Sequence, residues 1–236
     1  GLGGLELGTV GGGTRHFCPG YYQLPDKEHK YRDWKKEGHG PMNLDAAITQ
    51  SCDVYFYQLA HDMGIDKIAP FMAQFSFGRR TGVDLTGELP GLLPSREWKR
   101  AKKNQPWYPG ETLIMGIGQG YFLTTPLQLA AATAAFANGE AFLTPRIVAS
   151  QQDKASDTAV PITADRRPLT INNPKNWDYI TQSMLHVVEG LRGTAKGIRS
   201  KAYRIAGKTG TAQVFTVAQE EEYDEETVAE KLRDHA

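Results

Sequence analysis

The spacing of hydrophobic residues predicts many short helices and few strands. Leu44, Ala47 and Ile48 follow Asn43 at helical spacing, and asparagine commonly caps a helix N-terminus. Further helices, most of them ended by glycine, are expected at residues 54–63, 65–75, 126–138 and 177–189. Two β-like runs come late in the chain, at residues 203–207 and 212–217. This order of elements predicts an α/β or α+β fold.

The segments between these elements are rich in turn residues. Residues 18–41 resemble a loop, residues 81–109 a long surface excursion, and residues 153–174 a polar, irregular connection. Residues 99–103 contain four basic side chains, which we expect to face solvent.

Composition excludes several classes of protein. The 236 residues carry 27 Lys and Arg against 27 Asp and Glu, so no basic surface for nucleic acid is expected. A hydrophobic fraction of 40% with 23% charged residues is typical of a globular domain. No apolar run approaches the ~18 residues that span a bilayer. Two cysteines are too few for a disulfide framework.

The most specific local signal is Lys208-Thr209-Gly210-Thr211, which lies between the two β-like runs. A lysine beside two hydroxyl groups, with a glycine that lets a ligand approach the backbone, suits a substrate carboxylate along a sheet edge. So short a motif also occurs by chance, and a solvated lysine at a strand edge is the alternative.

A second signal is Ser51-Cys52-Asp53, at the junction of two predicted helices. Serine and aspartate are good N-caps, so one interpretation is a cap for the helix that begins at Val54. The serine enzymes that bind penicillin carry S-x-x-K, then S-x-N or S-x-D, then K-T-G. The second and third of these motifs occur here in that order.

Further segments extend the similarity, and the chain resembles the transpeptidase domain of class B penicillin-binding proteins. The similar segments lie in the same order at residues 51–60, 81–85, 116–120, 124–130, 193–195 and 208–213. Residues 31–40 are similar to the elongation-type group, penicillin-binding protein 2. The resemblance implies an antiparallel sheet flanked by helices, with an all-helical subdomain.

The resemblance also implies a mechanism. An activated serine would attack the D-Ala-D-Ala bond of a stem peptide, and an amine would resolve the acyl-enzyme. Ser51 would relay a proton while Lys208 supplies positive charge and a donor. Thr209 and Thr211 would hold the terminal carboxylate, and the Thr211 N–H would form half of the oxyanion hole. Asp53 stands where many relatives have asparagine; when ionised it accepts but cannot donate a hydrogen bond.

The expected boundaries follow from the same family pattern. No Ser-x-x-Lys occurs in residues 1–236, so the resemblance places this motif, with the nucleophile, before Gly1. Residues 1–8 would continue the helix that it begins, and the closing strands and C-terminal helix would follow Ala236. Residues 1–236 are therefore expected to be a fragment of the transpeptidase domain.

Cys18, Asp33, His39 and Cys52 form a second constellation. Two thiolates, an imidazole and a carboxylate are ligand types that suit tetrahedral zinc. Their spacing matches no compact zinc finger, but penicillin-binding protein 2 relatives are known with a zinc site in this region. The resemblance therefore implies zinc as a cofactor.

Two alternatives to zinc stay open. Cys18 and Cys52 would form a disulfide in an oxidising periplasm, or they are unrelated free thiols. His16 and His29 are possible substitute ligands, although each is more commonly an ordinary loop histidine.

The resemblance implies a periplasmic domain anchored in the bacterial inner membrane. The expected partners are stem peptides, β-lactams, the membrane glycan polymerase and rod-shape scaffold proteins. A non-catalytic penicillin-recognising or sensor domain is one alternative, and the division-specific transpeptidase is another, although the loop with Asp33 and His39 argues against the latter. A β-lactamase is not favoured, because no motif is assignable to a deacylating water.

Overall fold

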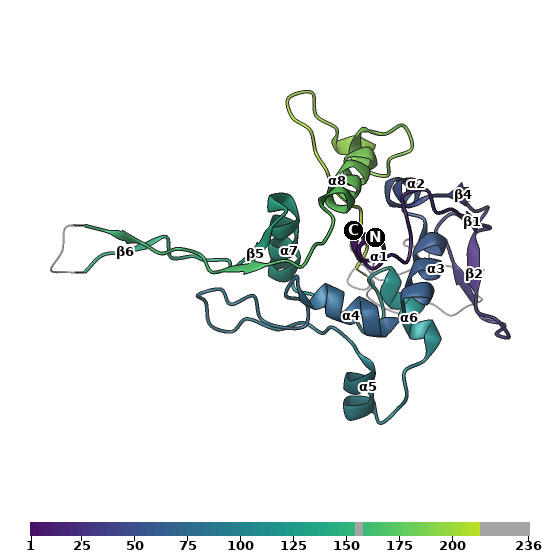
Figure 1. The fold of residues 1–236 in the computed structure, drawn as a ribbon, viewed down its shortest axis with the longest axis horizontal. Helices are drawn as coiled ribbons and strands as arrows, with labels where there is room; N and C mark the ends of the chain where they lie inside the picture. Colours follow the sequence, from purple (N-terminus) through teal and green to yellow (C-terminus); the bar gives the residue numbers. More distant parts are fainter. Residues whose placement is uncertain (154–157, 213–236) are drawn as a thin grey trace, which may run out of the picture. The chain divides into compact units, whose positions relative to one another are not determined.

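The computed structural model describes residues 1–153 and 158–212, which fall into two compact units (Figure 1). Unit 1 contains residues 1–59 and the described residues from 178 onward, and unit 2 contains residues 60–177. The helix α3 (Asp53–Met63) and the helix α8 (Pro174–Glu189) each run from one unit into the other.

Unit 1 combines helices with short antiparallel strand pairs. Besides α3 and α8, the described residues of this unit form the helices α1 (Leu2–Glu6) and α2 (Leu44–Gln50) and the 3-10 helix η1 (Lys196–Ile198). Strand β1 (His16–Cys18) pairs with β4 (Gly40–Met42), and β2 (Tyr21–Gln23) pairs with β3 (Lys30–Arg32). The segment predicted to be a loop therefore forms strands, and the register places Cys18 opposite Gly40.

Helix α2 forms for the reason that its sequence predicts. The Asn43 side chain accepts a hydrogen bond of 2.9 Å from the N–H of Ala46, which caps the first turn. Leu44, Ala47 and Ile48 are buried on one face. The helix ends at Ser51, so this face fixes the position of the serine.

The described residues of unit 2 form, besides the ends of α3 and α8, further helices and an antiparallel ribbon. The helices are α4 (Ile65–Ala73), α5 (Arg96–Lys103), α6 (Pro109–Gly116) and α7 (Pro126–Asn138). In the ribbon, β5 (Ala141–Leu143) pairs with β8 (Arg166–Pro168), and β6 (Ser150–Gln151) pairs with β7 (Val160–Pro161). Figure 1 shows the ribbon as a long arm extending from α7.

Two features of unit 2 correct the sequence predictions. The segment at residues 81–109, predicted to be a surface excursion, contains the helix α5. The side chain of its N-cap, Ser95, accepts a hydrogen bond from the N–H of Trp98. Lys99 is not solvated: it is 1% exposed, donates to Glu111, and lies 4.2 Å from the centre of the Tyr108 ring. A run of charged residues in a sequence does not show that one of them is buried against a partner of opposite charge.

The β-like run at residues 203–207 is not a strand in the structure. Its last member, Gly207, donates its N–H to the carbonyl of Met184 in α8 at 3.1 Å, instead of to a neighbouring strand. Of the second run only Ala212 lies among the described residues.

Within the described part of the chain, helices are mixed with antiparallel strand pairs, as the α/β (α+β) prediction requires. None of the described helices is long and apolar enough to cross a membrane.

Candidate active site and metal cluster

Ser51 occupies a constrained turn between two helices. It is the C-cap of α2, with φ 56° and ψ 50° in the left-handed region. The N–H of the next residue, Cys52, donates to Ala47 at 3.0 Å, and α3 begins at Asp53. Few non-glycine residues adopt this backbone conformation, and such residues are often found at functional sites. The predicted junction is confirmed, with the serine ending α2.

The structure brings the two predicted motifs together, although 157 positions separate them. The Lys208 ammonium donates to Ser51 Oγ at 2.9 Å, and to Oγ1 and the carbonyl of Thr209 at 3.2 and 3.0 Å. Burial lowers the pKa of Lys208, and the negative charge of Asp53 opposes this change. Gly210 and Thr211 follow at exposed positions.

Asp53 is fixed by a tryptophan that the sequence did not assign to the site. Asp53 Oδ2 accepts from the backbone N–H of Trp34 at 3.1 Å, while the Trp34 indole N–H donates to the carbonyl of Ser51 at 2.8 Å. Burial raises the pKa of Asp53 to about 6, and the charge of Asp33 adds to this rise. The one available sequence signal was the position of Trp34 directly after the predicted ligand Asp33.

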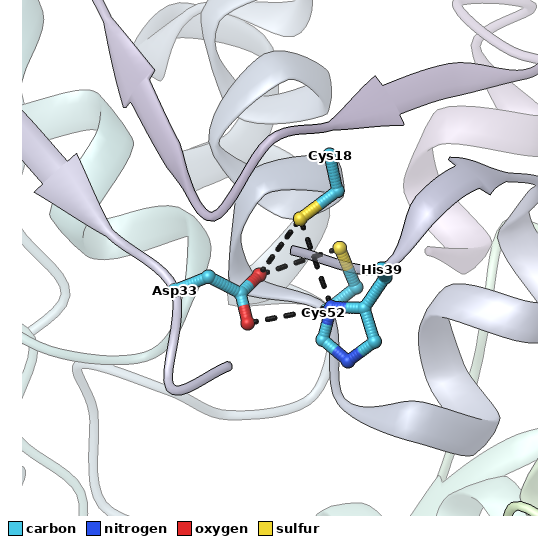
Figure 2. Close-up of side chains that lie close together, drawn as sticks. All are labelled: Cys18, Asp33, His39 and Cys52. Atoms are coloured by element: carbon cyan, nitrogen blue, oxygen red, sulfur yellow. Dashed lines mark hydrogen bonds and ion pairs between the residues drawn. The ribbon is translucent and has the colours of Figure 1, made fainter. Parts of the chain in front are cut away.

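The four predicted metal ligands lie together next to this turn. Figure 2 shows the side chains of Cys18, Asp33, His39 and Cys52 pointing toward one another, and their ligand atoms all lie within 4.8 Å of each other. Both sulfurs lie 3.4 Å from Asp33 Oδ2, and His39 Nδ1 lies 3.6 Å from Cys18 Sγ and 3.4 Å from Asp33 Oδ1.

Local structure explains how these residues meet. Cys18 ends β1, Asp33 and His39 lie in the segment between β3 and β4, and Cys52 separates α2 from α3. Gly38 has a φ of 77°, and a Cβ there would lie 2.2 Å from the carbonyl oxygen of Cys18, so only glycine permits this approach.

The donor set fits a zinc ion. The side chains of Asp33 and His39 are almost fully buried, and burial raises the pKa of both cysteine thiols, which disfavours the thiolate form when no cation is bound. A bound divalent cation stabilises thiolates and neutral imidazole, which are its ligands.

The alternatives to zinc involve the two cysteines and two other histidines. Cys18 and Cys52 are both buried, with free thiols in the structure. His16 packs edge-on against Tyr55 at 5.0 Å, and His29 packs against Tyr31 at 4.5 Å. Neither histidine belongs to the cluster found among the described residues.

These features define the class of protein: a serine-and-lysine site on a mixed α and β fold that carries the penicillin-binding motifs. Residues 2–230 match the model of the penicillin-binding protein transpeptidase domain, and the chain therefore belongs to this family. The resemblance and the fold implied by it are confirmed.

Individual members of this family are similar to the chain over most of its length. It is 44% identical over 238 residues to "Peptidoglycan D,D-transpeptidase MrdA" of Acinetobacter baumannii; the match covers 99% of this chain and 34% of that protein. The crystal structure of Pseudomonas aeruginosa PBP2 in complex with WCK 5153 has a TM-score of 0.83 and 48% identity, covering 90% of this chain and 46% of that chain.

A third similar structure is the complex between PBP2 and MreC from Helicobacter pylori. Its TM-score is 0.77 at 37% identity, covering 90% of this chain and 38% of that chain. The chain thus spans about a third of the length of the curated relative described above.

Proposed function

We propose that the protein containing this chain is a peptidoglycan D,D-transpeptidase that cross-links stem peptides through an acyl-serine intermediate during cell elongation. The main supporting observation is the 2.9 Å contact between Lys208 Nζ and Ser51 Oγ, which unites the second and third family motifs. The name of the A. baumannii relative supports the same reaction.

In the proposed reaction, the nucleophile belongs to a Ser-x-x-Lys motif that precedes Gly1. Its oxygen attacks the carbonyl carbon of the penultimate D-alanine, the peptide bond breaks, and the terminal D-alanine leaves as an amine. Ser51 passes the proton lost by the nucleophilic hydroxyl to this amine, and the positive charge of Lys208 assists the transfer. An amine of a second stem peptide then attacks the ester, which restores the serine and forms the cross-link.

The carboxylate end of the substrate lies along Lys208-Thr209-Gly210-Thr211 in this proposal. Lys208 contributes positive charge, and the hydroxyl groups of Thr209 and Thr211 donate hydrogen bonds. The backbone N–H of Thr211 stabilises the oxyanion, a role whose removal costs about 10²–10³ in rate. β-Lactams carry a carboxylate and a reactive amide, so they acylate the same serine.

We also propose that zinc is bound by Cys18, Asp33, His39 and Cys52. With an ion bound, these four residues would link the β3–β4 segment to the turn that carries Ser51 and would hold the orientation of that turn.

The proposed setting is the periplasmic face of the bacterial inner membrane, with an anchoring helix outside this chain. The proposed partners are the membrane glycan polymerase and rod-shape scaffold proteins. The existence of a PBP2–MreC complex from H. pylori supports an assembly with a scaffold protein.

Labelling of the full-length parent protein with a fluorescent penicillin tests the proposal. Covalent labelling is expected, and Lys208→Ala should weaken it severely because the donor to Ser51 and to the drug carboxylate is lost. Lys201→Ala is the matched control, since Lys201 is exposed on the segment leading to the motif. Absence of labelling in a folded, full-length parent would contradict the proposal.

A further inference from the structure

The turn at residues 190–195 contacts the neighbourhood of both active-site motifs without belonging to either. The N–H of Ala195 donates to the carbonyl of Val187 near the end of α8 at 3.0 Å. The N–H of Thr194 donates to the carbonyl of Thr49 at 3.3 Å, two residues before Ser51. A Cβ on Gly193 would lie 2.2 Å from the carbonyl oxygen of Val187, so this close approach requires glycine. The turn is therefore anchored to α8 and α2.

The side chain of Thr194 reaches the other motif. Its Oγ1 lies 3.0 Å from Oγ1 of Thr209, whose hydroxyl also accepts from Lys208 Nζ at 3.2 Å. A hydroxyl group has one hydrogen to donate and two lone pairs to accept with. When Lys208 and Thr194 each donate to Thr209, both lone pairs are filled. The hydrogen of Thr209 is then left to donate away from both neighbours.

We propose that Thr194 is a positioning residue that orients the hydroxyl hydrogen of Thr209 toward the terminal carboxylate of the substrate. This inference rests on the proposed transpeptidase function. The chain Thr194 O–H to Thr209 O–H to carboxylate is polarised in one direction, and each donor strengthens the next. Thr194 thus favours ligands that end in a carboxylate over neutral ones, without touching the ligand.

The test compares two ligands that differ only in this group. Acylation rate constants of the full-length parent are measured with benzylpenicillin and with its methyl ester, which has no free carboxylate. Thr194→Val removes the hydroxyl and should lower the benzylpenicillin rate about threefold to tenfold, the range of one neutral hydrogen bond, while the ester rate changes little. Thr194→Ser keeps the hydroxyl and should retain the wild-type ratio of the two rates.

Two further variants isolate the effect. Thr133→Val is the matched control, because Thr133 is also exposed and its hydroxyl donates only to the Leu129 carbonyl at 2.8 Å in unit 2; both rates should stay unchanged. In a Thr209→Val background, Thr194→Val should no longer change the ratio of acid to ester rates, since the hydroxyl through which it acts is absent.

Each outcome is decisive. The positioning role would be overturned if Thr194→Val lowered the acylation rates with acid and ester equally, so that the ratio of the two rates stayed unchanged. It would also be overturned if Thr194→Ser changed this ratio as much as Thr194→Val does. Either result would leave the transpeptidase proposal intact. Failure of the wild-type parent to react with benzylpenicillin would instead overturn the proposed function, and this inference with it.

Discussion

At the scale of single residues, sequence motifs predicted the groups that meet but not the groups that hold them. Ser51 and Lys208 were identified as parts of two motifs, and they lie in direct contact. Trp34 and Thr194 lie in segments similar to the family but were given no role, because hydrogen bonds between distant segments leave no periodic signal in a sequence. An exposed tryptophan is as common in surface patches as beside an active site.

The lowered pKa of Lys208 predicts a pH dependence. The lysine must be protonated to place a positive charge beside Ser51 and a substrate carboxylate, and burial lowers its pKa below the ordinary value, although Asp53 opposes this change. The rate of acylation by benzylpenicillin should therefore fall at alkaline pH, and this fall should occur at a lower pH than for a lysine with an ordinary pKa. A rate profile measured from neutral to alkaline pH checks this.

Lys208→Arg provides the control for the pH prediction. Arginine stays charged throughout this range, so the variant should react more slowly but lose the alkaline decline. The Lys208 assignment is wrong if wild-type and variant proteins decline at the same pH.

At the scale of elements, the helices that the sequence predicted were found because their signals are local, although α5 was missed. Asn43 caps α2 as predicted, and Thr125 forms a capping box with Gln128 at the start of α7. The strand at residues 203–207 was predicted wrongly because a strand depends on a neighbour elsewhere in the chain, and Gly207 bonds to α8 instead. The burial of Lys99 likewise depends on its partner Glu111.

The glycine turn that carries Thr194 gives a prediction at this scale. Gly193→Ala should lower the free energy of unfolding by about 1–3 kcal/mol, because its Cβ meets the backbone oxygen of Val187, which has little room to move. Gly197→Ala is the matched control, since a Cβ there meets nothing within 4 Å. Urea unfolding of the full-length parent measures both changes, and equal stability of the two variants would show that the turn tolerates a side chain.

At the scale of the whole molecule, the family and its fold were predictable because the motifs run in order along nearly the entire chain. The closeness of the four proposed metal ligands was not derivable from their spacing alone, since it depends on the pairing of β1 with β4 and on the start of α3. The strand pairs of unit 1 bring these ligands to the turn that carries Ser51.

Metal removal tests the zinc proposal at this scale. Protein purified without chelators should contain about one zinc per chain, and a chelator under reducing conditions should lower its melting temperature by several degrees. The expected change has this size because zinc present at about 100 times its dissociation constant would stabilise the folded state by about 2.7 kcal/mol. His39→Ala should melt at the same temperature with and without chelator, because one ligand is lost.

Elemental analysis and mass spectrometry of the same samples complete the metal test. Added zinc should restore the melting temperature of the wild-type protein after chelation. The zinc proposal fails if the untreated protein contains no zinc and carries a Cys18–Cys52 bridge.

Transpeptidation is tested by turnover of the full-length parent with a donor stem pentapeptide and an acceptor amine, followed by mass spectrometry. We predict an acyl-enzyme intermediate, release of D-alanine, and an equal amount of cross-linked product, all abolished by prior treatment with benzylpenicillin. Stable acylation by penicillin without any release of D-alanine or cross-linked product would contradict the proposed transpeptidase activity and identify a penicillin-recognising domain that lacks it.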